Sequence, residues 1–134
     1  MPHCVLLYTP NVDRMTDMGA LCRSLADTML TVLDESGKQV FPTGGTRVLA
    51  YPAAHCAVAD GKGDYSFVYI NVRMAAGRSE AVKKTAGDTL LAVVQKHFAP
   101  VFDKNPIGIT LQIDESAGQV YDARHSSLHP LFLK

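Results

Sequence analysis

The sequence has no excess charge of either sign, because 13 lysine and arginine residues balance 13 aspartate and glutamate residues. It therefore lacks the general positive field through which proteins attract nucleic acids and anionic lipids. It also lacks the run of roughly 18 apolar residues needed for a membrane helix, and the basic and apolar start of a signal peptide. We expect no nucleic-acid or membrane partner, a cytoplasmic location, and anion binding only at individual arginines.

Cysteine is scarce, with residues only at positions 4, 22 and 56. An odd number without a C-x-x-C spacing argues against a disulfide framework and against a structural zinc site. We therefore expect Cys4, Cys22 and Cys56 to be buried, reduced thiols.

Motifs for nucleotide and hydrolase chemistry are missing: the chain has no G-x-S-x-G, G-x-x-x-x-G-K-[ST] or G-x-G-x-x-G. The pair Gly44-Gly45 is typical of a turn rather than a phosphate loop. His125 and His129 have the spacing of a metal pair on a helix, but nearby serines and Pro130 weaken that helix, and a polar cluster is the better interpretation. We expect neither a cofactor nor a metal.

What is present is a chain of 134 residues, 47% of them hydrophobic, which suffices for one domain with one core. The pattern predicts a strand over residues 3–8 and then a helix from about Asp13 to Glu35, capped by Asp13 or Thr16 and ended by Ser36-Gly37. The apolar stripe of this helix consists of Leu21, Leu25, Met29 and Leu33.

The second half of the chain repeats this order without obvious identity to the first. A strand over residues 47–51 closes the first unit, and a turn at residues 60–64 leads to a strand over residues 65–74. A second helix follows Ser79 and stops near Pro100, and a last strand covers residues 107–113. The helix stripe comprises Val82, Ala86, Leu90, Val94 and Phe98, and the last strand alternates through Ile107, Ile109, Leu111 and Ile113.

Two β-α-β units, roughly residues 1–60 and 61–134, predict an α+β fold with one four-stranded sheet and two helices on one face. Each strand pair joined by a helix should be parallel. Two helices cover only one face of such a sheet, so Phe67 and Tyr69 would stay partly uncovered on the other. We therefore expect a homo-oligomer.

Three residues are candidates for chemistry. Removal of Met1 would leave Pro2 with a secondary amine, a base whose pKa an apolar pocket and nearby cations would lower. Arg78 precedes a helix whose free amides and dipole favour an anion, and Arg47 opens the second strand beside Gly44-Gly45.

Several motifs occur in an order and spacing that resemble the 5-carboxymethyl-2-hydroxymuconate delta-isomerase family of the tautomerase superfamily. They are Met1-Pro2-His3, Phe41-Pro42-x-x-Gly45-x-Arg47, Ala59-Asp60-Gly61-x-x-Asp64-Tyr65-x-Phe67-Val68, Gly77-Arg78-Ser79, His97-Phe98 and His129-Pro130-Leu131-Phe132. The resemblance covers nearly the whole chain.

The resemblance implies a doubled β-α-β fold, a trimer with sheets lining its centre, and keto-enol isomerisation of a ring-cleavage product from homoprotocatechuate degradation. It further implies that Pro2, freed of Met1, shuttles the proton, while Arg47 and Arg78 hold substrate carboxylates and steady the dienolate. A base near neutrality and cations where negative charge develops are what this reaction requires.

The sequence leaves two other hypotheses open. It departs from related chains at Leu7, where they tend to have Glu, and in the tail at Arg124-His125-Ser126-Ser127. These departures suggest a tautomerase for another anionic keto or enol acid. A chain that keeps Met1 has the Pro2 nitrogen in an amide without basic character. Such a chain would be a non-catalytic oligomer that binds small carboxylates.

Overall fold

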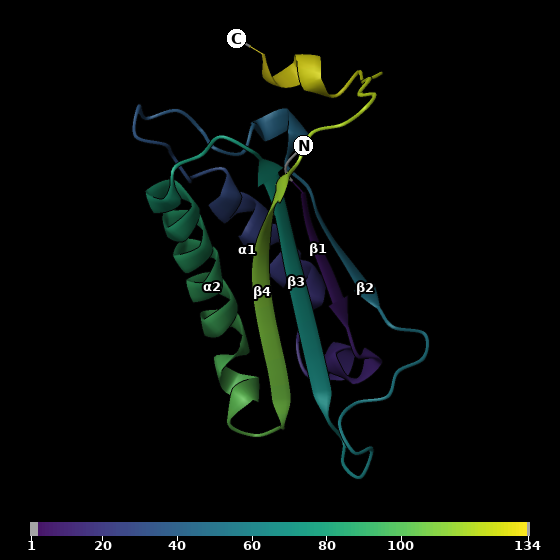
Figure 1. Cartoon of the computed structure of the whole chain (residues 1–134). Helices are drawn as coiled ribbons and strands as arrows, with labels where there is room; N and C mark the ends of the chain where they lie inside the picture. The colour runs from purple at the N-terminus through teal and green to yellow at the C-terminus, as the bar shows by residue number, and fades with distance from the viewer. Residues whose placement is uncertain (1–2, 134) are drawn as a thin grey trace.

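The computed structural model describes residues 3–133, which form four strands, two α-helices and three short 3-10 helices (Figure 1). In chain order these are β1 (His3–Tyr8), η1 (Pro10–Arg14), α1 (Met18–Met29), η2 (Thr43–Gly45), β2 (Val48–Pro52), β3 (Ser66–Ala75), α2 (Glu80–Phe102), β4 (Ile107–Ser116) and η3 (His129–Phe132). Among these described helices, none is long and apolar enough to cross a membrane.

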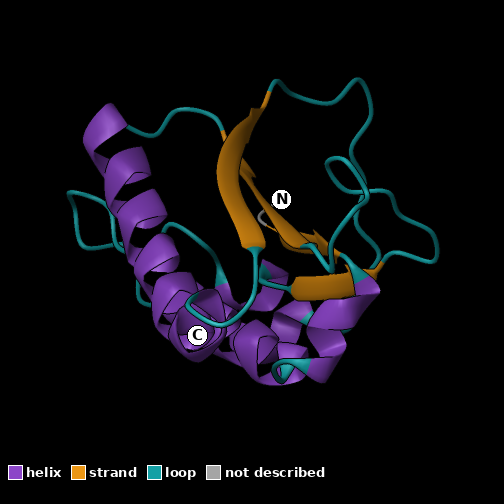
Figure 2. Ribbon diagram, turned by 90° about the horizontal axis from the view of Figure 1, so that it is seen from below, coloured by secondary structure: helices purple, strands orange, loops and turns teal. Residues whose placement is uncertain are grey.

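The four strands form one sheet in the order β2-β1-β3-β4. Each pair joined by an α-helix is parallel, β1 with β2 and β3 with β4, whereas the two central strands β1 and β3 are antiparallel. Figure 2 shows the helices gathered on one side of the strands. The expected fold, two β-α-β units sharing one sheet with two helices on one face, is confirmed.

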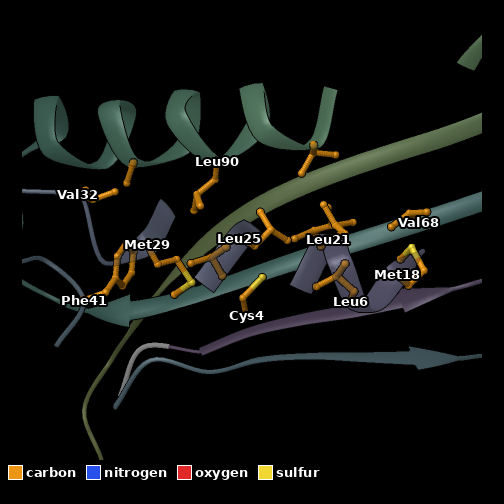
Figure 3. Close-up of a cluster of buried hydrophobic side chains, with 14 of the residues drawn as sticks. Cys4, Leu6, Met18, Leu21, Leu25, Met29, Val32, Phe41, Val68 and Leu90 are labelled. Atoms are coloured by element: carbon orange, nitrogen blue, oxygen red, sulfur yellow. The ribbon is translucent and has the colours of Figure 1, made fainter. Parts of the chain in front are cut away.

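The core lies between this sheet face and the two helices (Figure 3). Alternation along β3 buries Val68, Ile70, Val72 and Met74, as the sequence predicts. The expected stripe of α2 is also buried, from Val82 to Phe98. Since the same apolar contacts fix strands and helices together, the ends of the strands have a defined position relative to the start of α2.

The predicted helix from Asp13 to Glu35 is wrong at both ends. Pro10 starts the separate 3-10 helix η1 instead, and α1 begins only after Asp17, whose side chain accepts a hydrogen bond from the Ala20 amide at 3.0 Å. Neither Asp13 nor Thr16 is the cap. The helix ends at Met29, so residues 30–40 form a turn region, in which Leu33 bridges to Gln39 and is 51% exposed rather than part of the stripe.

Two smaller expectations also need correction. The helix α2 continues past Pro100 to Phe102, because a proline in the last turn removes only one backbone donor. All three cysteines are free thiols, but only Cys4 is buried, where burial raises its pKa to about 12. Cys22 is half-buried and Cys56 is exposed, in the irregular segment after β2.

The second face of the sheet has no covering element among residues 3–133. Leu7, Leu49, Tyr51 and Phe67 are between 41% and 50% exposed there. Gly108 pairs with Phe67, and a Cβ atom at residue 108 would lie only 2.8 Å from the Phe67 ring. The absence of a side chain at Gly108 thus gives the ring its place on this face.

Candidate active site

The strand order brings two of the three predicted site residues, Arg47 and Arg78, to one end of the sheet. Because β1 and β3 are antiparallel, His3 at the start of β1 pairs with Arg73 near the end of β3. Because β2 is parallel to β1, Arg47 also stands at this end, one residue before β2. Pro2 lies outside the described residues, but its sequence neighbour His3 belongs to this same end.

Arg47 is fixed through its backbone and its side chain. Its carbonyl oxygen accepts a hydrogen bond from the Cys4 amide at 3.0 Å, which ties it to β1. Its Nη1 donates to the Gly45 carbonyl at 3.1 Å. The half-buried side chain lines a pocket of about 660 Å³ bounded by Cys22 of α1, Gly44 and Phe132.

The C-terminal 3-10 helix η3 packs against η2 beside this pocket, and in Figure 1 it lies above the same end of the sheet. A Cβ atom at Gly44 would be 3.2 Å from the His129 Cα, so the two backbones approach closely. His129 shares a hydrogen bond of 2.6 Å between its Nδ1 and Ser126 Oγ. Gly44 therefore permits a close contact in addition to the turn that the sequence suggests, and residues 125–128 form no helix.

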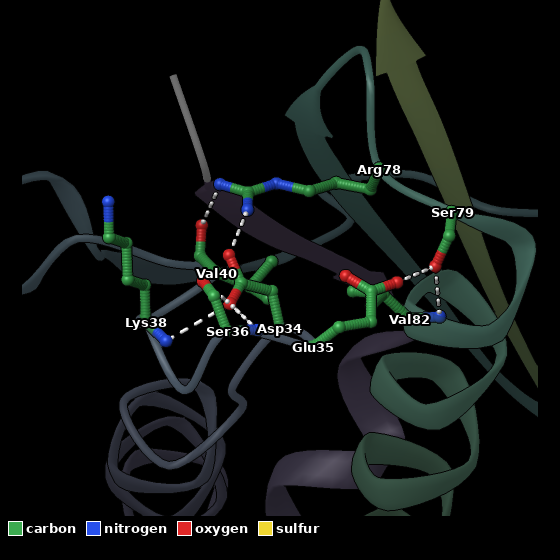
Figure 4. Close-up of polar contacts among 8 residues, drawn as sticks. All are labelled: Asp34, Glu35, Ser36, Lys38, Val40, Arg78, Ser79 and Val82. Carbon is green, nitrogen blue, oxygen red and sulfur yellow. Dashed lines mark hydrogen bonds and ion pairs between the residues drawn. The ribbon is translucent and has the colours of Figure 1, made fainter.

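Arg78 lies in the short loop between β3 and α2. Gly77, with a φ of 101°, turns the chain away from β3 in a conformation that favours glycine. The Arg78 side chain reaches the turn region after α1, where Nη1 donates to Asp34 Oδ2 at 3.2 Å and Nη2 to the Val40 carbonyl at 3.4 Å (Figure 4). Only 27% of this side chain is exposed.

Asp34 is itself held firmly. Its Oδ1 accepts hydrogen bonds from the Ser36 hydroxyl at 2.7 Å, the Ser36 amide at 2.9 Å and the Lys38 amide at 3.0 Å. These hydrogen bonds, that of the Ser36 hydroxyl foremost, together with the Arg78 charge, hold the pKa of the Asp34 carboxyl below its usual range. The group is therefore a carboxylate at neutral pH.

The next residue, Glu35, connects the same turn to the start of α2. Ser79 is the N-cap of α2: its Oγ accepts from the Val82 amide at 3.2 Å and donates to Glu35 Oε1. The Ser79 hydroxyl is also the main cause that lowers the pKa of Glu35. Arg78 and the helix cap beside it are thus both attached to one turn.

A second ion-pair group joins the end of β4 to α2. Lys83 Nζ lies 2.6 Å from Glu115 Oε1 and 2.7 Å from Glu80 Oε1. The hydrogen bond from Lys83 lowers the pKa of Glu115, and the two carboxylates raise the pKa of Lys83. The end of β4 and the start of α2 are therefore linked at this end of the molecule.

The two arginines at this end of the sheet belong to loops that are fixed separately, and only Arg47 lines the pocket of about 660 Å³. Arg47 is held by the loop before β2, and Arg78 by the turn after α1. A guanidinium group has five N–H donors, and the bonds to Asp34 and Val40 use one on each Nη of Arg78. The remaining donors of both arginines suit planar carboxylates. Within residues 3–133 no group of three side chains is placed to hold a metal ion.

Sequence reasoning missed Asp34 as the partner of Arg78 and Glu35 as the partner of Ser79. Both acidic residues fall inside the region predicted as helix, which gives them no role at the site. The signal that could have found them is Asp34-Glu35-Ser36-Gly37, since an Asp followed two residues later by Ser and then Gly is typical of a turn closed by the Asp side chain.

Comparison with known proteins assigns the chain clearly. The family model of 5-carboxymethyl-2-hydroxymuconate isomerase matches residues 2–132. A solved 5-carboxymethyl-2-hydroxymuconate delta-isomerase is 55% identical, with a TM-score of 0.94 over 100% of this chain and 94% of that chain. A 5-carboxymethyl-2-hydroxymuconate isomerase from Deinococcus radiodurans R1 is 31% identical, with a TM-score of 0.84 over 99% and 95%.

A curated 5-carboxymethyl-2-hydroxymuconate Delta-isomerase from Escherichia coli is 24% identical over 98% of this chain and 99% of its own length. The fold alone is shared with a more distant solved chain, the F6 fused 4-OT wild type asymmetric trimer. That chain is 14% identical, with a TM-score of 0.57 over 96% of this chain and 98% of that chain.

The carboxylates at this end of the sheet predict a loss of stability in acid. The folded-state pKa values of Asp34, Glu35 and Glu115 lie below the unfolded values of about 4. The contribution of these carboxylates to the stability of the folded state is present above pH 4, and it is lost as the pH falls through their folded-state pKa values. In urea titrations between pH 6 and pH 2.5, the free energy of unfolding should decrease, and Glu115→Gln should make this decrease shallower. If the free energy of unfolding of Glu115→Gln fell with decreasing pH as steeply as that of the wild type, the role of the Lys83–Glu115 pair would be contradicted.

Proposed function

This chain belongs to the 5-carboxymethyl-2-hydroxymuconate isomerase family and is an isomerase, and we propose that it interconverts the tautomers of 5-carboxymethyl-2-hydroxymuconate or a close analogue with Pro2 as its base. The observation that carries the proposal is the common location of the candidate residues. Arg47 and Arg78 stand at the sheet end where β1 begins, directly after Pro2 in the sequence.

In the proposed reaction the secondary amine of Pro2 accepts the proton of the substrate enol hydroxyl. The electron pair left on oxygen spreads over the conjugated chain as a dienolate. The resulting ammonium then returns the proton to a carbon of this chain, which produces the conjugated keto acid and restores the amine. Atoms and electrons balance within substrate and enzyme, so the step needs no redox partner.

The arginines supply charge where the reaction needs it. Substrate carboxylates are planar and accept paired hydrogen bonds from a guanidinium group. Negative charge that develops on the dienolate is stabilised by donors already oriented before the reaction, and the hydrogen bonds of Arg47 and Arg78 orient both groups. Two cations also disfavour a protonated amine nearby, so the pKa of Pro2 should lie below that of an exposed proline amine.

We expect Arg47→Ala and Arg78→Ala each to lose about 2 to 4 kcal/mol of transition-state stabilisation, or about 30-fold to 1,000-fold in kcat/KM. Each change removes a positioned charge, and the apolar core should still fold. An ultraviolet turnover assay with 5-carboxymethyl-2-hydroxymuconate measures the effect.

The matched control is Lys84→Ala, because the Lys84–Asp88 pair is exposed on α2 with side chains 77% and 64% accessible. This control should keep the wild-type kcat/KM. A folded Arg78→Ala or Arg47→Ala variant with full activity would remove that arginine from the proposed site. Turnover of an arylpyruvate without turnover of the muconate would instead identify a tautomerase for another keto or enol acid.

Blocking the Pro2 nitrogen should abolish turnover, whereas Pro2→Ala should lower it without eliminating it, because a primary amine still accepts a proton. Intact mass shows whether Met1 is removed, and a chain that retains Met1 serves as the blocked form. In the processed enzyme kcat/KM should rise with pH as the amine loses its proton. Undiminished turnover by a chain with Met1 attached would rule out Pro2 as the base. A processed chain that binds carboxylates but turns nothing over would be the non-catalytic oligomer.

The uncovered sheet face supports a further part of the proposal, a homotrimer. Leu7, Leu49, Tyr51 and Phe67 expose apolar surface on the side opposite the helices. Leu7, one of the departures from related chains, belongs to this face and pairs with Tyr51 and Tyr69. A distant chain with the same fold is described as a trimer. We therefore assign this face to contacts between copies of the chain.

Phe67→Asp should shift the oligomer toward monomer, because it places a charge on the apolar face without touching the core. Sedimentation velocity measures the shift. The control is Val120→Asp, at a fully exposed position in the segment after β4, which should leave the assembly unchanged. A wild-type chain that sediments as a monomer at high concentration would contradict the proposed trimer.

A further inference from the structure

The geometry points to Asp34 as a positioning residue for the Arg78 guanidinium, which sets the direction of the donors that this arginine offers to a substrate carboxylate. The inference rests on the proposed role of Arg78 as a substrate ligand. It concerns the turn after α1, which the reaction itself does not use.

The first step of the argument is the number of contacts on Arg78. An arginine in a loop has several rotatable bonds and loses free energy when a ligand immobilises it. Here Asp34 Oδ2 and the Val40 carbonyl accept from different terminal nitrogens, at 3.2 and 3.4 Å, and Figure 4 shows both acceptors on the same side of the guanidinium group. Two such contacts restrict both the position and the rotation of the group before any substrate arrives.

The second step is that Asp34 is more rigid than the group it holds. One carboxylate oxygen takes three donors from Ser36 and Lys38, and the other takes Arg78. The Asp34 side chain is only 15% exposed. Because the hydrogen bonds of Oδ1 hold the Asp34 carboxylate in the turn, Oδ2 also has a fixed position. The Arg78 guanidinium group is oriented by its hydrogen bond to this oxygen.

The third step is charge. A carboxylate beside Arg78 cancels part of the positive field that would attract an anionic substrate. If Asp34 acted only through its charge, removing that charge would strengthen substrate binding. If Asp34 acts by positioning, removing the ion pair weakens catalysis although the site becomes more positive. The two roles therefore predict opposite signs for the same substitution.

The test compares Asp34→Asn, Asp34→Glu, Arg78→Ala and the double variant Asp34→Asn/Arg78→Ala in the turnover assay. Asparagine keeps an oxygen for Ser36 and Lys38 but lacks the carboxylate for Arg78. We expect kcat/KM to fall about fivefold to tenfold in Asp34→Asn, the scale of freeing one long side chain, and Asp34→Glu to recover most of this loss. In the Arg78→Ala background, Asp34→Asn should have no further effect.

The matched control is Asp88→Asn, which removes a carboxylate from the exposed Lys84–Asp88 pair and should leave kcat/KM unchanged. A second readout does not depend on activity. In 15N-labelled protein, hindered rotation of a held guanidinium keeps the Arg78 Nη signals apart, and Asp34→Asn should merge them. Circular dichroism of each variant verifies that it folds.

The outcomes are distinct. An unchanged or higher kcat/KM in Asp34→Asn, with Arg78→Ala still impaired, overturns the positioning role and leaves the proposed function intact. A loss from Asp34→Asn that is equally large in the Arg78→Ala background also overturns it, because Asp34 would then act through the turn rather than through Arg78. Full activity of Arg78→Ala overturns the proposed role of that arginine and this inference with it. If the wild type turns nothing over, the proposed function fails. Independently of activity, Nη signals of Arg78 that stay apart in Asp34→Asn would contradict the positioning role.

Discussion

The antiparallel pairing of β1 with β3 is the constraint on which the rest of the structure depends. Each β-α-β unit alone gives a parallel strand pair whose starts lie together. Joining the units through antiparallel central strands brings the starts of β1 and β2 to the ends of β3 and β4. At this end of the sheet, Arg47 of the first unit lies just before β2, and Arg78 of the second unit lies just after β3. A parallel junction of β1 with β3 would place the two arginines at opposite ends of the sheet.

The same pairing puts two loops of different origin within reach of each other. With both helices on one face, the turn after α1 and the loop before α2 meet above the same end of the sheet (Figures 1 and 4). The residues that make these contacts, 34–40 and 78–79, are about forty positions apart in the chain. The geometry of the contacts therefore depends on the packing of α1 and α2 against the core. The shared apolar core thus determines how precisely Arg78 is held.

Much of the fold could be predicted from the residue pattern, whereas the geometry of the candidate site depends on contacts between residues far apart in the chain. Alternation along residues 66–75 and the stripe of α2 specify strand, helix and buried face, because each signal is repeated over several turns or residues. The predicted first helix is too long because Leu33 continues the spacing of Leu21 and Leu25, although Asp34 and Ser36 form a turn beside it. That turn is completed by Arg78, a contact that no local pattern around Asp34 contains.

Arginine at position 78 suits the proposed double task of pairing with Asp34 and binding a substrate carboxylate. The chain has no net charge, so attraction for an anion has to come from a few cations near the site. A lysine ammonium could pair with Asp34, but as a point charge it has no second planar edge for a carboxylate. A guanidinium group can satisfy Asp34 and Val40 with one hydrogen on each Nη and still present further donors in the same plane. The group that is fixed by the fold can therefore also take the proposed role of substrate ligand.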